Sequence, residues 1–266
     1  MQVSAMNTAV VDIFGAFKHY SLVGMLGWQD VRQRYRRSVL GPFWLSISMA
    51  VTIGIMWVIF GHIYHVPMGE FLPFLTLGMI FWGFICSVIT EGCLGFIVSE
   101  HIIKQLPIPL FVHLLRLLWR NLLILAHNFM IFPIVFVLLG RQLSWVMWLS
   151  IPGFLLLVMN LMWVVLLLST LCARYRDVPQ IVSSLLQVFF YLTPIMWMPS
   201  LITSSIGTYL LNLNPMYHLL SIVRSPMLGQ SPTMYNWGVS LLMAFIGWGL
   251  TLALYGRFKR RIVYWL

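Results

Sequence analysis

Long apolar runs with almost no charge alternate with short charged segments along the whole chain. Each run is about 20 residues or longer, the length a helix needs to cross the hydrocarbon core of a bilayer. Because backbone polar groups must be satisfied within lipid, such runs form helices rather than open strands. The pattern predicts an all-α, polytopic membrane protein with six transmembrane helices, at residues 40–62, 71–98, 112–139, 145–173, 180–198 and 235–255.

The charged residues predict how these spans are oriented. The 266 residues include 16 Lys and Arg but only six Asp and Glu. All basic residues except Arg141 and Arg224 fall at span ends that face one side, if Arg116 and Arg120 belong to the inner end of the third span. Since basic residues are retained in the cytoplasm, both termini are expected to be cytoplasmic. The net charge of +10 is attributed to topology and to anionic membrane lipids, not to nucleic acid.

The segment before the first span predicts a helix that lies on the membrane surface. Residues 18–37 mix apolar, aromatic and basic side chains, as amphipathic interface helices do; a solvated cytoplasmic helix is the alternative. Gly41 and Pro42 stand at the junction, where proline is tolerated in the first helical turn. We expect a hinge there. The chain then divides into a cytoplasmic N-terminus (1–39), a six-span domain (40–256) and a basic cytoplasmic C-terminus (257–266).

Residues 199–233, before the last span, form an irregular outer segment. Two apolar pieces, at about residues 201–213 and 216–228, are interrupted at residues 212–215 and 224–226. Each piece is too short to span a bilayer and too apolar for a free loop, which favours re-entrant or interfacial helices. Irregular backbone at membrane depth needs protein or water to satisfy its hydrogen bonds, so this segment should line or cover a cavity.

The sequence offers no catalytic or nucleotide-binding chemistry. The dipeptide Gly-Lys does not occur, so there is no Walker A loop to hold ATP phosphates. The six carboxylates are scattered, and the three cysteines lie in apolar runs without a paired-cysteine motif. We therefore expect a protein that is not an enzyme, with no metal and no cofactor in this chain, whose driving force comes from elsewhere.

Glu91 is the one acid within a span, and an intramembrane carboxylate needs a partner. The second and third spans form an antiparallel hairpin that turns near residues 104–106, so residues equidistant from the turn face each other. This register predicts a Glu91–Arg120 pair, with Arg116 as the reserve. A static ion pair between helices is favoured over proton coupling.

Polar and aromatic residues suggest a conduit. Gln180, Ser183 or Ser184, Gln187 and Tyr191 share one helical face of the fifth span, where they would bind a neighbouring helix or line a hydrated channel. Some aromatics lie outside the expected interface belts, and their rings could pack on sugar faces or on ordinary neighbours. Asn128 and Asn160 are expected to form interhelical hydrogen bonds. The candidate channel-lining residues are Trp57, Gln180, Ser184, Gln187, Tyr191 and Trp197.

Four short motifs, in order along nearly the whole chain, resemble type-2 ABC-transporter permeases that export polysaccharides. Residues 37–44 (RSVLGPFW) resemble the signature R-x-x-LGP-[FL]-W at the start of the first span. Residues 174–178 (RYRDV), 191–195 (YLTPI) and 214–216 (NPM) resemble three further elements. The chain is most similar to O-antigen exporter permeases of the Wzm type, with capsule and teichoic-acid permeases as relatives.

This resemblance implies a homodimer around a continuous channel in the bacterial inner membrane, with two copies of a separate ABC ATPase that bind ATP and Mg. A lipid-linked polysaccharide would pass outward. The loop at about 99–111 and the turn after the fourth span would contact the ATPase, through Glu100, His101, Lys104, Gln105, Pro107, Pro109, Arg174, Arg176 and Asp177. The hinge or gate would comprise Arg34, Arg37, Gly41, Pro42 and Trp44.

Three other functions remain open at the level of sequence. The same architecture could move a drug or a small lipid, with fewer aromatics along a narrower conduit. A membrane-embedded glycan-lipid enzyme would need a clustered acidic or His/Asp motif, which the sequence lacks. A structural anchor would not need the polar face of the fifth span or an acid within the second.

Overall fold

The computed structural model describes residues 2–34, 36, 41, 43–142, 144–201 and 204–266, with backbone only for residues 2–5 and 34. These residues form helices, turns and bends, without strands. Five helical segments are long and apolar enough to cross a membrane: α3 (Phe43–Tyr64), α4 (Met68–Cys93), α7–α8 (Phe111–Leu138), η1–α9 (Trp145–Arg174) and α13 (Met234–Trp265). The expectation of an all-α polytopic membrane protein is confirmed.

The fifth expected span is shorter than its apolar run. Helix α10 (Val178–Leu192) has 15 residues, or about 22 Å of rise, against a hydrocarbon thickness of about 30 Å. Thr193 is extended, with ψ 136°, because the residue before a proline avoids the helical region. The chain bends at residues 193–197. The expected C-terminal end of the fifth span, at residue 198, is therefore wrong: the helix ends at Leu192.

The N-terminal region contains two helices where one was expected. Helix α1 (Gln2–Lys18) is followed after one residue by α2 (Tyr20–Arg34), and the pair is bent by 70°. Counted as one broken span, this pair would bring the candidate spans to six. Only the second of these helices was expected, because residues 1–17 carry no strong pattern.

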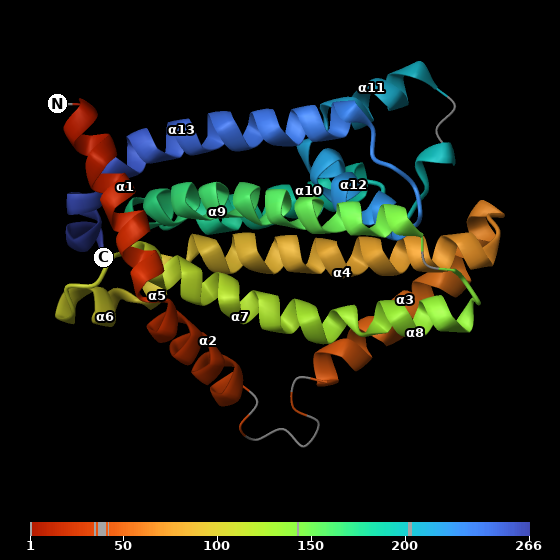
Figure 1. Cartoon of the computed structure of the whole chain (residues 1–266), viewed down its shortest axis with the longest axis horizontal. Helices are drawn as coiled ribbons and strands as arrows, with labels where there is room; N and C mark the ends of the chain where they lie inside the picture. The colour runs from red at the N-terminus through yellow and green to blue at the C-terminus, as the bar shows by residue number, and fades with distance from the viewer. Residues whose placement is uncertain (1, 35, 37–40, 42, 143, 202–203) are drawn as a thin grey trace.

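The long helices run side by side as an elongated bundle (Figure 1). Both chain termini and the short helix α6 (Glu100–Gln105) lie at one end, which we call the terminal end. Helices α11 (Ser205–Leu213) and α12 (Pro215–Met227) lie at the opposite end, the far end. The basic residues after position 256 continue α13 to Trp265 rather than forming a separate tail.

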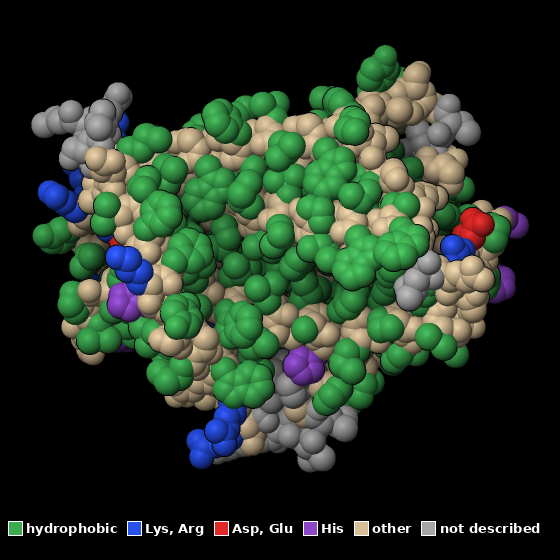
Figure 2. Space-filling model, viewed as in Figure 1, with side chains coloured by type: hydrophobic (Ala, Val, Ile, Leu, Met, Phe, Trp, Pro, Cys, Tyr) green, Lys and Arg blue, Asp and Glu red, His purple; other side chains and the backbone are tan. Residues whose placement is uncertain are grey.

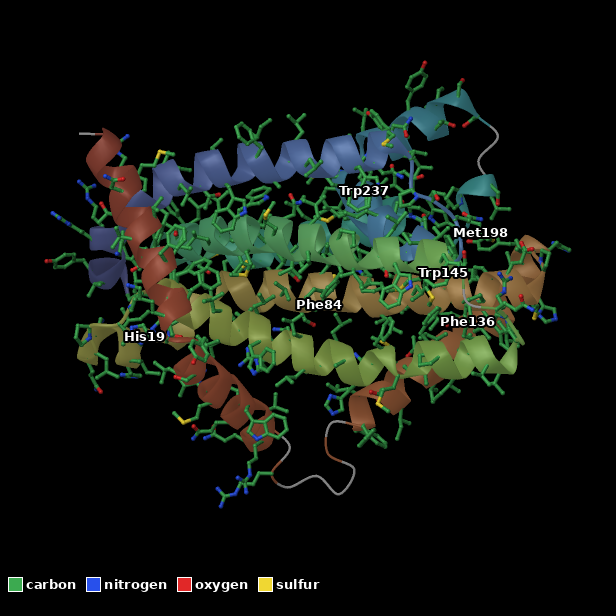
Figure 3. The ribbon with its side chains drawn as sticks, in the orientation of Figure 1. His19, Phe84, Phe136, Trp145, Met198 and Trp237 are labelled. Carbon is green, nitrogen blue, oxygen red and sulfur yellow. The ribbon has the colours of Figure 1, made fainter. Side chains whose placement is uncertain are left out.

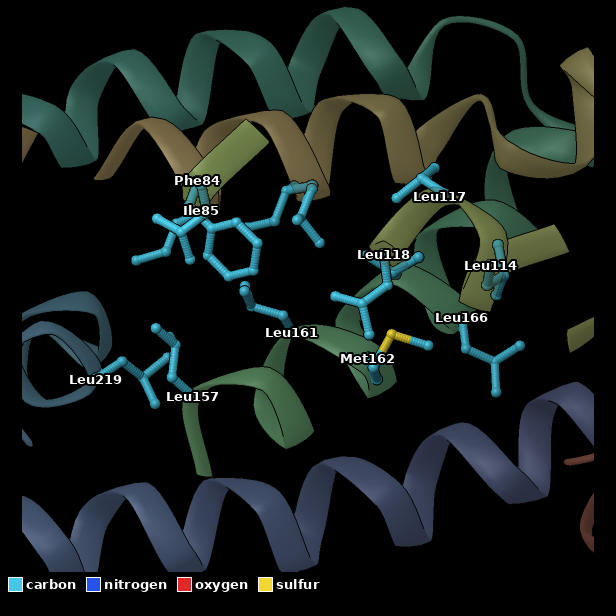
Figure 4. Packing of buried hydrophobic residues seen from close by; sticks show 14 of the residues in the cluster. Phe84, Ile85, Leu114, Leu117, Leu118, Leu157, Leu161, Met162, Leu166 and Leu219 are labelled. Carbon is cyan, nitrogen blue, oxygen red and sulfur yellow. The ribbon is translucent and has the colours of Figure 1, made fainter. Parts of the chain in front are cut away.

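The core is built around α4 and α9. Large aliphatic and aromatic side chains from α4, α7, α9 and α12 interlock there, including Ile85, Leu118 and Leu161 (Figure 4). Apolar side chains also cover the outer face between the two ends, while Lys and Arg side chains lie toward the periphery (Figure 2). An apolar exterior between polar ends suits a bundle that is surrounded by lipid.

Polar side chains within the bundle form hydrogen bonds between helices. Ser46 Oγ donates to Asn128 Oδ1 at 3.0 Å, and Asn160 Nδ2 donates to the Ser240 carbonyl at 3.1 Å. The interhelical role expected for these two asparagines is confirmed. Short α5 (Gly95–Val98) follows α4, and Ser169 of α9 donates its hydroxyl to the Gly92 carbonyl near that break.

The irregular segment before the last helix contains the two short helices that the sequence predicted. Asn214 separates them: its Oδ1 accepts from the Met216 amide at 3.0 Å and so caps α12, while Pro215 occupies the first turn. Helix α12 is largely buried and contacts α4, α9 and α13. The break expected at residues 224–226 is wrong, because Pro226 lies in the last turn, where the helix is already ending.

Candidate functional site

A cluster of ion pairs joins α2, α4 and α7 toward the terminal end. Arg120 Nη2 lies 2.7 Å from Glu91 Oε2, so the pair expected from the hairpin register is present. Arg116 Nε donates to Asp30 Oδ2 at 2.7 Å, and its Nη2 contacts the other carboxylate oxygen. Arg120 Nη1 also lies 3.4 Å from Asp30. Arg116 is therefore not a reserve partner for Glu91 but connects α2 to α7 through Asp30.

Local helix geometry explains this cluster. Arg116 and Arg120 are four residues apart and project from one face of α7, along which α2 packs. Asn121 adds a hydrogen bond to Glu91 Oε2 at 2.6 Å. Asp30 was not among the residues predicted from the sequence, because it is 86 residues from Arg116. Arg34 lies four residues after Asp30, a spacing that suggests a local ion pair, so no sequence signal pointed from Asp30 to α7.

A cavity of about 210 Å³ opens beside the cluster. Its lining includes Ser99 and His113 besides the two ion pairs. His113 is 3% exposed, and neither ring nitrogen has a hydrogen-bond partner among the described residues. A polar cavity of this size accommodates water molecules that satisfy such groups. The joint between the N-terminal helices and the bundle therefore combines charged side chains with a space large enough for water.

Substitutions in the cluster should not have equal effects. Arg120→Gln removes the partner of Glu91 and a contact to Asp30, whereas Glu91→Gln leaves Arg120 with Asp30. We expect Arg120→Gln to lower the unfolding free energy of the detergent-solubilised protein by about 1–2 kcal/mol and Glu91→Gln by less. Thermal unfolding measures both.

The double exchange Glu91→Arg/Arg120→Glu tests the wider cluster. It restores the pair but places a carboxylate beside Asp30, so the rescue should be incomplete. Full recovery of thermal stability would contradict the contact between Arg120 and Asp30.

The residues expected to contact an ATPase lie at the terminal end. The short α6 occupies the expected coupling loop, and the turn between α9 and α10 lies at the same end (Figure 1). Lys104 Nζ is 2.6 Å from Glu100 Oε1, and this hydrogen bond lowers the pKa of the Glu100 carboxyl. Exposed members of the set are His101, Lys104, Gln105, Pro107, Arg174, Arg176 and Asp177, while Glu100 and Pro109 are half-buried.

The hinge between α2 and α3 is described only in part. Gly41 has φ +56°, a left-handed conformation that glycine adopts without strain. Its carbonyl accepts from the Trp44 amide at 3.4 Å, and the Trp44 side chain is exposed. Arg37, Pro42 and the side chain of Arg34 lie outside the described residues. The hinge and gate role of this stretch stays a prediction.

The expected polar face of α10 is on the surface of the chain. Gln180, Ser184, Gln187 and Tyr191 are all exposed, and the buried residue of this helix is Leu186. Ser184 Oγ donates to the Gln180 carbonyl of its own helix. This chain therefore leaves the stripe free to face a partner or an aqueous conduit.

The aromatic candidates have different positions. Tyr191 and Trp197 line a cavity of about 380 Å³ between the end of α10 and α11, and Trp197 Nε1 donates to the Tyr191 carbonyl at 3.2 Å. Trp57 instead packs against α4 and donates to the Met68 carbonyl at 3.0 Å. The irregular segment lines a cavity, as expected, whereas Trp57 ties α3 to α4.

These features define a class of protein: a helical membrane protein that has ion pairs and an exposed polar surface at one end and two short helices, α11 and α12, at the other. The sequence profile of the ABC-2 type transporter family matches residues 21–228, and the chain belongs to this family. Its members are the membrane permease subunits of ABC transporters and work with an ABC ATPase. The protein is accordingly a multi-pass inner-membrane protein.

Three curated relatives are similar over most of the chain. An O-antigen export system permease protein RfbA from Klebsiella pneumoniae is 26% identical over 208 residues, covering 76% of this chain and 78% of that protein. A second protein of this name from the same species is 25% identical over 203 residues, with the same coverage. A third, from Myxococcus xanthus, is 23% identical over 210 residues, covering 77% and 79%.

Proposed function

We propose that this chain is the transmembrane subunit of an ABC transporter that exports a lipid-linked polysaccharide, an O-antigen, across the bacterial inner membrane. The observation that carries this proposal is the family match over residues 21–228 together with three relatives that are all named O-antigen export permeases. In this proposal the terminal end is cytoplasmic, in agreement with the retention of basic residues on that side.

A second copy of the chain is part of the proposal. Only 6% of the apolar window of α3 is buried in the single chain, against 72% for α4. Helix α10 buries Leu186 alone and exposes both its polar stripe and apolar residues such as Ile181 and Val188. Pairing across α3 and α10 would cover the apolar surface, and the polar stripe would then line the channel between two protomers.

Two copies of an ABC ATPase, which bind ATP and Mg, would dock at the terminal end. The ATPase can shift the permease between closed and open states only through contacts that differ between those states. The exposed α6 and the α9–α10 turn offer such contacts. The ion pairs of Asp30 would carry a displacement of α2 into α7, and through Glu91 into α4.

A clean deletion of the gene tests the export function. The expected phenotype is loss of surface polysaccharide with accumulation of the lipid-linked polymer in the cytoplasm, because synthesis continues without a path across the membrane. Extraction of the polymer and surface labelling measure the two pools. Plasmid-borne wild type should restore both, whereas a partner ATPase inactivated in its Walker A lysine should reproduce the deletion. Normal surface glycan in the deletion strain would refute the proposal.

A further inference from the structure

The two basic residues that break the charge pattern, Arg141 and Arg224, come together at the far end. They lie on different elements, after α8 (Ile131–Leu138) and on α12, and line the same cavity of about 480 Å³. Met198, at the far end in Figure 3, is also part of its wall. Neither residue is needed to retain a cytoplasmic segment, so their convergence requires another explanation.

Arg224 is buried without a compensating charge. Its side chain is 3% exposed, its Nη1 donates to the Pro194 carbonyl at 2.6 Å, and its guanidinium lies 3.8 Å over the Phe74 ring. Among the described residues, no carboxylate lies within ion-pair distance of Arg224 or Arg141. A buried charge ordinarily has an ionic partner. The Pro194 carbonyl and the Phe74 ring are uncharged, so the positive charge of Arg224 is not neutralised by them.

The remaining cavity wall supplies further hydrogen-bond donors. Ser221 and Ser225 lie on either side of Arg224 in α12, and Tyr217 lies one turn before Ser221. Glu70 is the acidic residue of this lining, so the two guanidinium groups leave the cavity with a net positive charge. Arg141 Nη2 donates to the Gly69 carbonyl at 3.1 Å, which holds the loop after α8 against the start of α4. The donors therefore converge on a preformed space.

We propose that this far-end cavity binds a phosphate or diphosphate group, with Arg224 and Arg141 as its cationic ligands and the α12 hydroxyls as additional donors. Guanidinium groups match phosphate oxygens in geometry and charge. The group can come from two sources: a phosphate or diphosphate that links the exported glycan to its lipid, which rests on the proposed function, or the headgroup of a membrane phospholipid. In either case, the ligand binds at the far end and next to the bend that ends α10.

Calorimetric titration of the full-length chain in nanodiscs of zwitterionic lipid tests this site. Geranyl diphosphate should bind, and geraniol, which lacks the phosphates, should not. Arg224→Gln and Arg141→Gln should each weaken binding by about tenfold, the effect of losing a charged hydrogen bond. Arg257→Gln, which removes an exposed cation of α13 near the terminal end, is the matched control and should bind as the wild type does.

The ligand comparison separates the two sources. Tighter binding of geranyl diphosphate than of a short-chain phosphatidylglycerol assigns the site to the exported carrier, and the reverse order assigns it to phospholipid. Arg141 is exposed, so its variant keeps the test valid if Arg224→Gln does not fold. Absence of binding, or wild-type affinity in Arg141→Gln and in a folded Arg224 variant, would overturn the site. Because binding is measured without export, such a result leaves the proposed transport function standing.

Discussion

Asp12→Ala is expected to destabilise the protein by about 3–5 kcal/mol, the effect of breaking a buried ion pair. Asp12 is 4% exposed and joins three helices. Its carboxylate lies 2.7 Å from Lys259 Nζ and accepts from the Tyr255 hydroxyl at 2.7 Å, both on α13. It also accepts from the Leu110 and Phe111 amides, at 3.3 and 3.1 Å. Removing the carboxylate leaves buried donors without an acceptor.

Matched variants separate the ion pair from the hydrogen bonds. Lys259→Met should be less damaging than Asp12→Ala, because the carboxylate keeps three neutral donors. Asp177→Asn changes an exposed acid without a side-chain cap and should leave stability unchanged. Thermal unfolding in detergent gives the order, and limited proteolysis should show α1 released in Asp12→Ala. Equal stability of Asp12→Ala and the wild type would refute the assigned role.

The position of Asp12 bears on energy coupling. The amides of Leu110 and Phe111 are the first donors of α7, which have no partner within their own helix, and a carboxylate is favoured at this end of the helix dipole. Leu110 and Phe111 form the end of the loop that is proposed to contact the ATPase. Asp12 therefore anchors the end of the coupling segment to α1 and α13. Variants that stay folded but loosen this anchor should uncouple ATP hydrolysis from export.

Gly153→Ala is expected to displace α12 from α9. A Cβ atom at Gly153 would lie 2.2 Å from the Ile222 carbonyl oxygen and 2.9 Å from its carbon, both backbone atoms that cannot rotate away. The overpacked contact should lower the unfolding free energy by about 2–3 kcal/mol. Because α12 carries Arg224, the same variant should weaken phosphate binding at the far end. Thermal unfolding and the calorimetric titration measure the two effects.

Gly249→Ala on α13 is the control for helix propensity. A Cβ atom there meets nothing within 4 Å, and alanine is favoured over glycine within a helix by about 1 kcal/mol. We expect this variant to be unchanged or slightly more stable. If Gly153→Ala matched Gly249→Ala in both measurements, the close approach of α9 and α12 would not be needed for the fold.

The class of the fold was available from the sequence, because long apolar runs in lipid have little alternative to helix. The pairing of Glu91 with Arg120 was available for a similar reason: the two residues lie on one hairpin, about equally far in sequence from its reversal near residues 104–106. The two short helices before α13 were also predicted, since proline and an Asn cap mark their junction. In each case the prediction rests on residues close in sequence, or on two helices joined directly as a hairpin.

Long-range packing decided the rest. Asp12 looked like one of six scattered acids, and its partners range from Leu110 to Lys259, 98 to 247 residues away. The role of Asp30 likewise follows only from the packing of α2 on α7, which brings it to Arg116. The apolar composition of residues 180–198 predicted a continuous helix, but α10 ends at Leu192 because Pro194 follows. No periodicity relates Arg141 to Arg224. By itself, the sequence determined a helical membrane protein, because hydrophobic length is a local property. Only the tertiary structure placed its charges, because their partners come from distant helices.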